Sequence, residues 1–255
     1  MNTPPYDPVQ LRRQFLRNGY VLQAGFFNAA EIAHVREHLA RFIRDVVPTL
    51  PAGHVMYENK DDKGTLKQLE LSKYDPYFRA MLVGGELEKL ASVALASPVE
   101  GKALQYFNKP PRLGKPTPPH QDGYYFMITP PEAVTMWLAL DVADEENGCI
   151  SYVRGSHRSG MRPHGRSETL GFSQGITDFG TREDLTNEVL LPALPGDLLI
   201  HHAMTIHRAK GNRSLVRNRP ALGLVYYSTT VREDKKALVA YQNKLTTELD
   251  AAGKI

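Results

Sequence analysis

The 255-residue sequence is short of several features that would place it in a common protein class. It has a single cysteine, Cys149, so no disulfide forms within the chain, and a reducing compartment is expected. Its formal net charge of +3 is too small to suggest nucleic-acid binding. No apolar run is long enough to span a membrane, and residues 1–15 lack the basic-then-apolar pattern of a signal peptide. We therefore expect a cytoplasmic protein that binds neither nucleic acid nor membrane, with Cys149 as a buried, unreactive thiol.

The composition is instead that of a folded globular chain. Apolar residues make up 42% of the sequence and charged residues 23%, a balance that excludes both disorder and a coiled coil. A chain of this length can bury one substantial core. We expect a single domain over residues 1–255.

Helical patterns dominate residues 1–98. The segment 28–47 begins with Asn28 and carries Glu31 three residues later, which is a capping-box pattern. A second helix is expected over 85–96. In the first of these helices the apolar residues recur at helical spacing, at Ile32, Val35, Leu39, Phe42 and Val46.

Strand patterns dominate residues 99–232. Short segments rich in β-branched and aromatic residues follow one another, separated by turn signals and not by helix patterns. This rhythm predicts an antiparallel sandwich or barrel, so the expected fold class is mainly β with N-terminal helices, α+β. A long, weakly patterned segment over 155–190 predicts a functional loop, and 233–255 is expected to form a helical tail. The expected strands cover 99–109, 124–128, 133–142, 149–153, 197–207 and 221–231.

The segment 118–126, PPHQDGYYF, places His120 and Asp122 two residues apart. On a strand these two side chains project from the same face. An imidazole and a carboxylate on one face make two corners of the two-histidine, one-carboxylate triad that holds non-haem Fe(II), and such a triad needs a third ligand. The candidates for that ligand are His157, His164, His201, His202 and His207.

His207 is the preferred third ligand because of the residues that follow it. In HRAKGNRSLVRNRPAL, a histidine near a strand end precedes a turn with Asn212 and Ser214, and an arginine then begins the next strand. The planar guanidinium of arginine matches a carboxylate better than the ammonium of lysine does. The order of these residues is similar to that in the 2-oxoglutarate oxygenases, where such an arginine binds the distal carboxylate of the cosubstrate.

Taken together, these segments resemble the phytanoyl-CoA dioxygenase family of Fe(II)- and 2-oxoglutarate-dependent oxygenases. A single HxD motif is a weak signal, but six pieces occur in the order that the family has, and they span 105–228. The pieces are NKPP (108–111), HQD (120–122), WLALD (137–141), NGC…GSH (147–157), PGD (195–197) and H…N.S…R (207–219).

The resemblance implies a double-stranded β-helix, the jelly-roll or cupin-like fold, and it carries site residues over position by position. His120, Asp122 and His207 match the iron ligands. Arg219 matches the arginine that binds the distal carboxylate of 2-oxoglutarate, and Arg217 is the alternative because the turn before Arg219 is one residue longer here. Further cosubstrate contacts are implied at Gln105, Gln121, Trp137 and Lys67.

The resemblance also implies an activity. The cofactor is Fe(II), the cosubstrates are 2-oxoglutarate and O2, and ascorbate is a candidate stimulant. Halogenating relatives carry Gly or Ala at the carboxylate position, so Asp122 favours hydroxylation of an unactivated C–H bond with release of succinate and CO2. One alternative is the same chemistry ending in desaturation, cyclisation or cleavage. Another, of a different class, is a non-catalytic β-helix module that binds a metal or ligand.

Residues 152–167, YVRGSHRSGMRPHGRS, give the evidence on the class of substrate. They contain four arginines and no acidic residue. Arginine clusters on functional loops commonly hold carboxylate, phosphate or sulfate, so we expect a small, polar, anionic substrate. The alternative is a solvated basic loop. Tyr125 is expected to face away from His120 and Asp122. The candidate substrate contacts are Asn108, Tyr124, Phe126, Arg158, Arg162 and His202.

Overall fold

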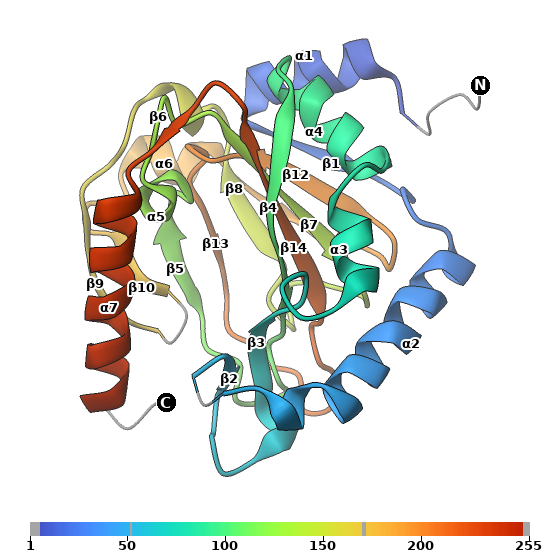
Figure 1. Ribbon diagram of the computed structural model, residues 1–255. Helices are drawn as coiled ribbons and strands as arrows, with labels where there is room; N and C mark the ends of the chain where they lie inside the picture. Colours follow the sequence, from blue (N-terminus) through green and yellow to red (C-terminus); the bar gives the residue numbers. More distant parts are fainter. Residues whose placement is uncertain (1–5, 52, 170–171, 252–255) are drawn as a thin grey trace.

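Two antiparallel sheets face each other in the computed structural model, which describes residues 6–51, 53–169 and 172–251 (Figure 1). The seven-stranded sheet consists, in spatial order, of β1 (Tyr20–Gln23), β12 (Leu198–His202), β7 (Ala133–Ala139), β14 (Ala221–Ser228), β4 (Val99–Phe107), β3 (Leu66–Glu70) and β2 (Val55–Tyr57). The four-stranded sheet consists of β11 (Glu188–Leu191), β8 (Ile150–Val153), β13 (His207–Ala209) and β5 (Thr117–His120). The expected mainly β, double-stranded β-helix fold is confirmed.

Helices cover the outer face of the large sheet (Figure 1). They are α1 (Pro8–Asn18), α2 (Ala29–Asp45), α3 (Pro76–Leu82) and α4 (Glu86–Leu95), with short 3₁₀ turns at Val47–Thr49 and Lys63–Thr65. The capping box predicted for α2 is present, since the Asn28 side chain accepts from Glu31 N and the Glu31 carboxylate accepts from Asn28 N. The apolar stripe of α2 packs into the larger hydrophobic core between helices and sheet.

The strands of the large sheet alternate between two cores. Met136, Leu138 and Ile200 face the helices, whereas Trp137 and Leu199 face the space between the sheets. Since successive residues of a strand point to opposite faces, this parity decides which side chains of β7 and β12 reach the interior. Strands β12 and β7 also pair in register, and His201 lies opposite Thr135.

Three strands of the large sheet lie in the part of the chain that was expected to be mostly helical. β1 pairs with β12, β3 pairs with β4, and β2 pairs with β3. Their segments are short, and YVLQ or LKQLE shows no sustained alternation of apolar and polar residues. β1 is stabilised by pairing with β12, far along the chain, whereas β2 and β3 pair with each other and β3 pairs in turn with β4.

Two sequence predictions in the second half of the chain are corrected. The segment expected to be a strand over 124–128 is largely the helical turn α5 (Gly123–Phe126), followed by β6 (Ile128–Thr129). The segment 155–190 is not an irregular loop. It contains a 3₁₀ turn (Ser156–Arg158), the paired strands β9 (His164–Thr169) and β10 (Phe172–Ile176), α6 (Arg182–Asn187) and the start of β11.

The C-terminal helix α7 (Lys235–Ala251) follows the short strand β15 (Arg232–Glu233), which pairs with β6. The predicted helical tail is therefore found, as far as residue 251. α7 lies on the far side of the molecule from α2 (Figure 1), and its Tyr241 ring is 6.3 Å from the ring of Tyr125. None of the helices in the described ranges is both long enough and apolar enough to cross a membrane.

Candidate active site

Strand pairing brings two of the predicted metal ligands together. β5 ends at His120 and β13 begins at His207, and the two residues lie directly opposite each other in the small sheet. Their ring centroids are 4.1 Å apart. The chain then leaves the strand, because Asp122 has helical backbone angles and leads into α5. His120 and Asp122 thus converge through a turn, not through strand alternation as the sequence suggested.

The three side chains point at one place. Asp122 Oδ1 is 3.4 Å from His120 Nε2 and 3.6 Å from His207 Nε2. The Nδ1–H groups of the two histidines donate to backbone oxygens, His120 to Pro118 O at 2.8 Å and His207 to Thr205 O at 3.0 Å. These hydrogen bonds fix the tautomer in which each Nε2 presents its lone pair, as metal-binding histidines require. The donor set is that of the facial triad that holds non-haem Fe(II).

The charges of this cluster also suit a cation. Burial alone would raise the pKa of Asp122, but His207, His120 and His201 together hold it well below its usual value. Burial, with repulsion from His120 and His201, lowers the pKa of His207 well below its usual value. At neutral pH the site therefore presents the Asp122 carboxylate and the neutral imidazole of His207, which are the forms that bind a divalent metal.

The second carboxylate oxygen of Asp122 is held by two side chains from the large sheet. Thr135 Oγ1 donates to Asp122 Oδ2 at 2.6 Å, and His201 Nε2 lies 3.0 Å from the same atom. His201 Nδ1 lies 2.9 Å from the hydroxyl of Tyr152, whose pKa burial raises well above its usual value. Sequence reasoning named His201 only as a possible third ligand and missed Thr135, because a cross-strand pairing with no sequence motif brings them together.

His202 does not line the cavity, which corrects the prediction that it is a substrate contact. It is on the helix-facing side of β12, with its ring 5.9 Å from Phe15 and 5.7 Å from His157. His201 and His202 are adjacent on one strand, so they must face opposite sides. The parity of β12 places His201 inside.

A cavity of about 100 Å³ extends from the three ligands to Arg219, with room for several water molecules or one small acid. The guanidinium carbon of Arg219 lies 5.1 Å from the centroid of the Trp137 ring. Arg219 is buried, and burial lowers its pKa to about 10. Among the described residues its Nε has no hydrogen-bond partner and no carboxylate pairs with its guanidinium. A buried cation in this state is costly without an anion, and the geometry therefore suits a bound carboxylate.

Two lysines accompany Arg219 at this end of the cavity. Lys67 is buried and its Nζ is 2.8 Å from a carboxylate oxygen of Glu58. Lys109 donates to Lys115 O and to Thr117 Oγ1, and burial followed by repulsion from Arg219 lowers its pKa well below its usual value. Because Glu58 pairs with Lys67 and the pKa of Lys109 is lowered, Arg219 is the cation at this end of the cavity that has no carboxylate partner among the described residues.

Arg217, the alternative to Arg219, lies outside the cavity. It forms an ion pair with Asp144 at 2.8 Å and a second one with Glu146. The turn between the strands is held by Asn212, whose side chain donates to Lys109 O and Arg217 O. The extra residue in this turn is thus accommodated before Arg219, which points inward.

The two glutamines differ from the expected cosubstrate contacts. Gln105 accepts from Gln68 Nε2 at 3.1 Å, and it is Gln68 that lines the cavity. Gln121 is fully buried and turned away from the ligands, with its side chain donating to Gly160 O and Met204 O and accepting from Arg162 N. Gln121 therefore anchors the 155–190 segment and does not face the cavity, which corrects the prediction.

The expected pocket walls are rearranged by the helical turn α5. Asn108 does line the cavity, and its Oδ1 accepts from the backbone N–H of Arg219. Tyr124 stacks on His164 at 4.3 Å, and Phe126 packs 5.1 Å from Tyr227, so neither lines the cavity. Tyr125, expected to face away, has its ring 6.0 Å from that of His120. Successive side chains are about 100° apart in a helical turn instead of 180° apart as in a strand. Tyr124 and Phe126, expected to face the ligands, therefore point elsewhere, whereas Tyr125 lies near His120.

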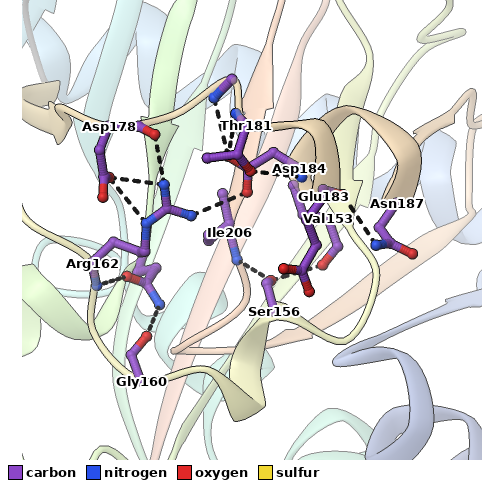
Figure 2. Close-up of polar contacts among 12 residues, drawn as sticks. Val153, Ser156, Gly160, Arg162, Asp178, Thr181, Glu183, Asp184, Asn187 and Ile206 are labelled. Carbon is purple, nitrogen blue, oxygen red and sulfur yellow. Dashed lines mark hydrogen bonds and ion pairs between the residues drawn. The ribbon is translucent and has the colours of Figure 1, made fainter.

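Arg158 and Arg162, the predicted anion contacts, are used within the protein. Figure 2 shows the Arg162 guanidinium between Asp178 and Asp184, at 2.9 Å and 3.1 Å. Arg158 donates to Leu16 O and Arg17 O at the end of α1. The segment 152–167 contains no acid, but the acids that neutralise Arg162 follow it in sequence and fold back onto it.

Cys149 is buried, as expected, and burial raises the pKa of its thiol to about 11. A thiol with a raised pKa is a poor nucleophile. It takes no part in the site.

Comparisons with known proteins agree with this geometry. A family model described as "Phytanoyl-CoA dioxygenase (PhyH)" matches residues 15–221. Phytanoyl-CoA dioxygenase 1 of Oryza sativa subsp. japonica is 28% identical over 247 residues, covering 83% of this chain and 86% of the relative. A probable alpha-ketoglutarate-dependent hypophosphite dioxygenase of Stutzerimonas stutzeri is 27% identical over 219 residues, covering 83% and 76%.

The solved structures show the same fold. The crystal structure of EvdO2 from Micromonospora carbonacea var. aurantiaca, complexed with 2-oxoglutarate, matches with a TM-score of 0.70 and 25% identity. The match covers 92% of this chain and 96% of EvdO2. The family model begins within α1 and ends at the first residue of β14, so it includes His120, Asp122, His207 and Arg219.

Proposed function

The chain belongs to the phytanoyl-CoA dioxygenase (PhyH) family of 2-oxoglutarate-dependent non-haem iron dioxygenases, and on this premise we propose that it hydroxylates an unactivated C–H bond of a small, polar substrate. One observation carries the proposal. The same cavity is lined by a His–Asp–His cluster and by a buried guanidinium that has no acid partner in the part of the chain that the structure describes. The cluster suits Fe(II), and the guanidinium suits the distal carboxylate of 2-oxoglutarate.

Each residue has a role in this proposal. His120, Asp122 and His207 would hold iron, with the histidines oriented by Pro118 O and Thr205 O. When bound, Fe(II) supplies the activation of O2, coupled to decarboxylation of 2-oxoglutarate, that C–H oxidation needs.

The cosubstrate end is built to hold a carboxylate in place. Arg219 would bind it, Trp137 would support the flat face of the guanidinium, and Lys67, paired with Glu58, would line the same end of the cavity. Asn108 and Lys109 accept the backbone N–H of Arg219, which fixes where the arginine enters the cavity.

An anaerobic titration tests this proposal. The protein is mixed with Fe(II) and 2-oxoglutarate, and the weak visible charge-transfer band of the chelate is followed. We expect the band in the wild type and in Arg217→Ala, because Arg217 pairs with acids outside the cavity. We expect its loss in His207→Ala, and in Arg219→Ala at 2-oxoglutarate concentrations that saturate the wild type. If iron binds but no band forms, the cosubstrate assignment is wrong. A band unchanged in Arg219→Ala would show that another group binds 2-oxoglutarate.

The finer proposal is that the substrate is anionic. It is supported by the hypophosphite dioxygenase relative, which is named for a small anion. Because Arg158 and Arg162 are used internally, the candidate contact is Arg166, which is exposed and lies on the same face of β9 as His164. His164 packs on Tyr124 beside the ligand segment.

Succinate release tests the substrate class. Small phosphonates, phosphinates and carboxylates would be screened for substrate-stimulated succinate formation in the wild type and in Arg166→Ala. We expect Arg166→Ala to raise the substrate KM while the uncoupled decarboxylation of 2-oxoglutarate stays the same. The product mass decides the outcome, since hydroxylation adds one oxygen, whereas desaturation and cyclisation each remove two hydrogens. Stimulation by neutral compounds alone would contradict an anionic substrate.

A further inference from the structure

The environment of Asp122 distinguishes its two oxygens, and this has a consequence for the metal site proposed above. Oδ1 faces His120 Nε2 and His207 Nε2. Oδ2 faces the large sheet, where it accepts hydrogen bonds from Thr135 Oγ1 at 2.6 Å and from His201 Nε2 at 3.0 Å. A carboxylate oxygen has two lone-pair positions, so two donors occupy Oδ2 fully.

We propose that His201 and Thr135 are positioning residues that restrict Asp122 to binding the metal through Oδ1 alone. The inference rests on the proposed iron site and adds how its carboxylate is controlled. A facial triad needs three open coordination positions, and a carboxylate that binds through both oxygens would take one of them. Two donors on Oδ2 compete against that second bond and preserve the open position.

The histidine is itself held in one orientation. A carboxylate oxygen only accepts, so His201 Nε2 must carry a proton, while His201 Nδ1 lies 2.9 Å from the Tyr152 hydroxyl. His201 is 2% exposed, and Tyr152 is fully buried and stacked at 4.7 Å on Tyr20. The donor on Oδ2 is thus fixed by packing on one side and by a hydrogen bond on the other.

The placement of both donors follows from the sheet. His201 on β12 and Thr135 on β7 are cross-strand neighbours, and the parity of both strands directs them inward. They act from the large sheet on a ligand that the small sheet and α5 supply. The packing of the large sheet against the small sheet therefore sets the orientation of the Asp122 side chain. No sequence motif indicates this role of His201 and Thr135.

Metal binding by the apo-protein tests the proposal without relying on turnover. Co(II) serves as the probe, and both its affinity and its visible ligand-field spectrum are measured by anaerobic titration. The informative variants are His201→Phe, which keeps a ring but removes the donor, and Thr135→Val, which keeps the shape but removes the hydroxyl. His201→Gln restores an N–H donor at similar reach. His202→Phe is the matched control, because it changes the neighbouring histidine on the opposite face.

We expect His201→Phe to weaken Co(II) binding about 10- to 100-fold, the range typical of lost outer partners, and to shift the ligand-field spectrum. Thr135→Val should act in the same direction. His201→Gln should recover most of the affinity and the wild-type spectrum, and His202→Phe should match the wild type in both. Recovery by glutamine separates positioning from simple packing.

Three outcomes overturn specific parts of the proposal. Wild-type affinity and spectrum in both His201→Phe and Thr135→Val would exclude positioning, while the metal site stands if His120→Ala abolishes binding. Equal loss in His201→Gln and His201→Phe would mean that packing, not the hydrogen bond, matters. Co(II) binding that is absent in the wild type would overturn the metal site and this inference together. Should His201→Phe fail to fold, as judged by circular dichroism, Thr135→Val alone decides, since it changes the same oxygen.

Discussion

The guanidinium of Arg219 lies over the ring of Trp137, with 5.1 Å between the guanidinium carbon and the ring centroid. Trp137 is the only tryptophan in the chain, so the tryptophan emission, excited selectively at about 295 nm or longer where the twelve tyrosines contribute little, reports on this place alone. The two residues meet because β14 and β7 pair, which sets Arg219, just before β14, beside the inward face of β7. A carboxylate that binds Arg219 changes the charge directly over the indole.

We therefore expect 2-oxoglutarate to change the Trp137 fluorescence of the metal-loaded, oxygen-free protein. The change should saturate with the same concentration dependence as the charge-transfer band. Arg219→Ala should abolish it, while Arg217→Ala should leave it intact. A response that persists without Arg219 would place the cosubstrate carboxylate elsewhere in the cavity.

Asp122→Ala should remove the charged ligand of the site and with it the oxygenase activity. We expect metal affinity to fall at least about 100-fold, at or beyond the upper end of the range for outer partners, because a direct ligand is lost. It would also leave His201 Nε2 and Thr135 Oγ1 without their acceptor. A metal titration measures the loss of affinity, and succinate release measures the loss of oxygenase activity. Substantial hydroxylation by Asp122→Ala would show that the triad is wrongly placed.

Arg162→Ala should reduce stability and leave cosubstrate binding unchanged. Arg162 joins Asp178 to Asp184, and the Asp184 side chain is 5% exposed, so the substitution leaves a buried carboxylate without its cation (Figure 2). We expect a loss of about 1–3 kcal/mol in the free energy of unfolding. Urea denaturation measures it, with the exposed Arg182→Ala as control. A raised substrate KM with unchanged stability would instead restore Arg162 as a substrate contact.

His157 should make the fold sensitive to acid. Burial, with repulsion from His202, lowers the pKa of His157 from 6.5 to about 4. The unfolded chain therefore takes up a proton first as the pH falls, and stability is lost progressively from pH 6.5 down to about 4. We expect His157→Asn to flatten the slope of unfolding free energy against pH in this window. An unchanged slope would mean that His157 does not carry this proton linkage.

Short-range sequence signals were sufficient for much of the fold and for the three residues of the candidate metal cluster. The capping box of α2 and the residue types at His120, Asp122 and His207 could be recognised because each depends on neighbours in sequence or on an ordered series of motifs. Arg219 could be recognised as the candidate carboxylate-binding residue because of its position after His207. The direction of Tyr125 could not be predicted correctly, since a strand and a helical turn fit the same aromatic run.

The sequence by itself determined which chemical groups are available and their order along the chain: two histidines and an aspartate for a metal, and an arginine for a carboxylate. Only the tertiary structure decided which groups meet. It turned His201 inward and His202 outward, supplied Asp178 and Asp184 to neutralise Arg162, and placed Thr135 against Asp122. The reason is physical. Local patterns specify periodicity, but the face that becomes buried depends on strands that pair across long stretches of the chain.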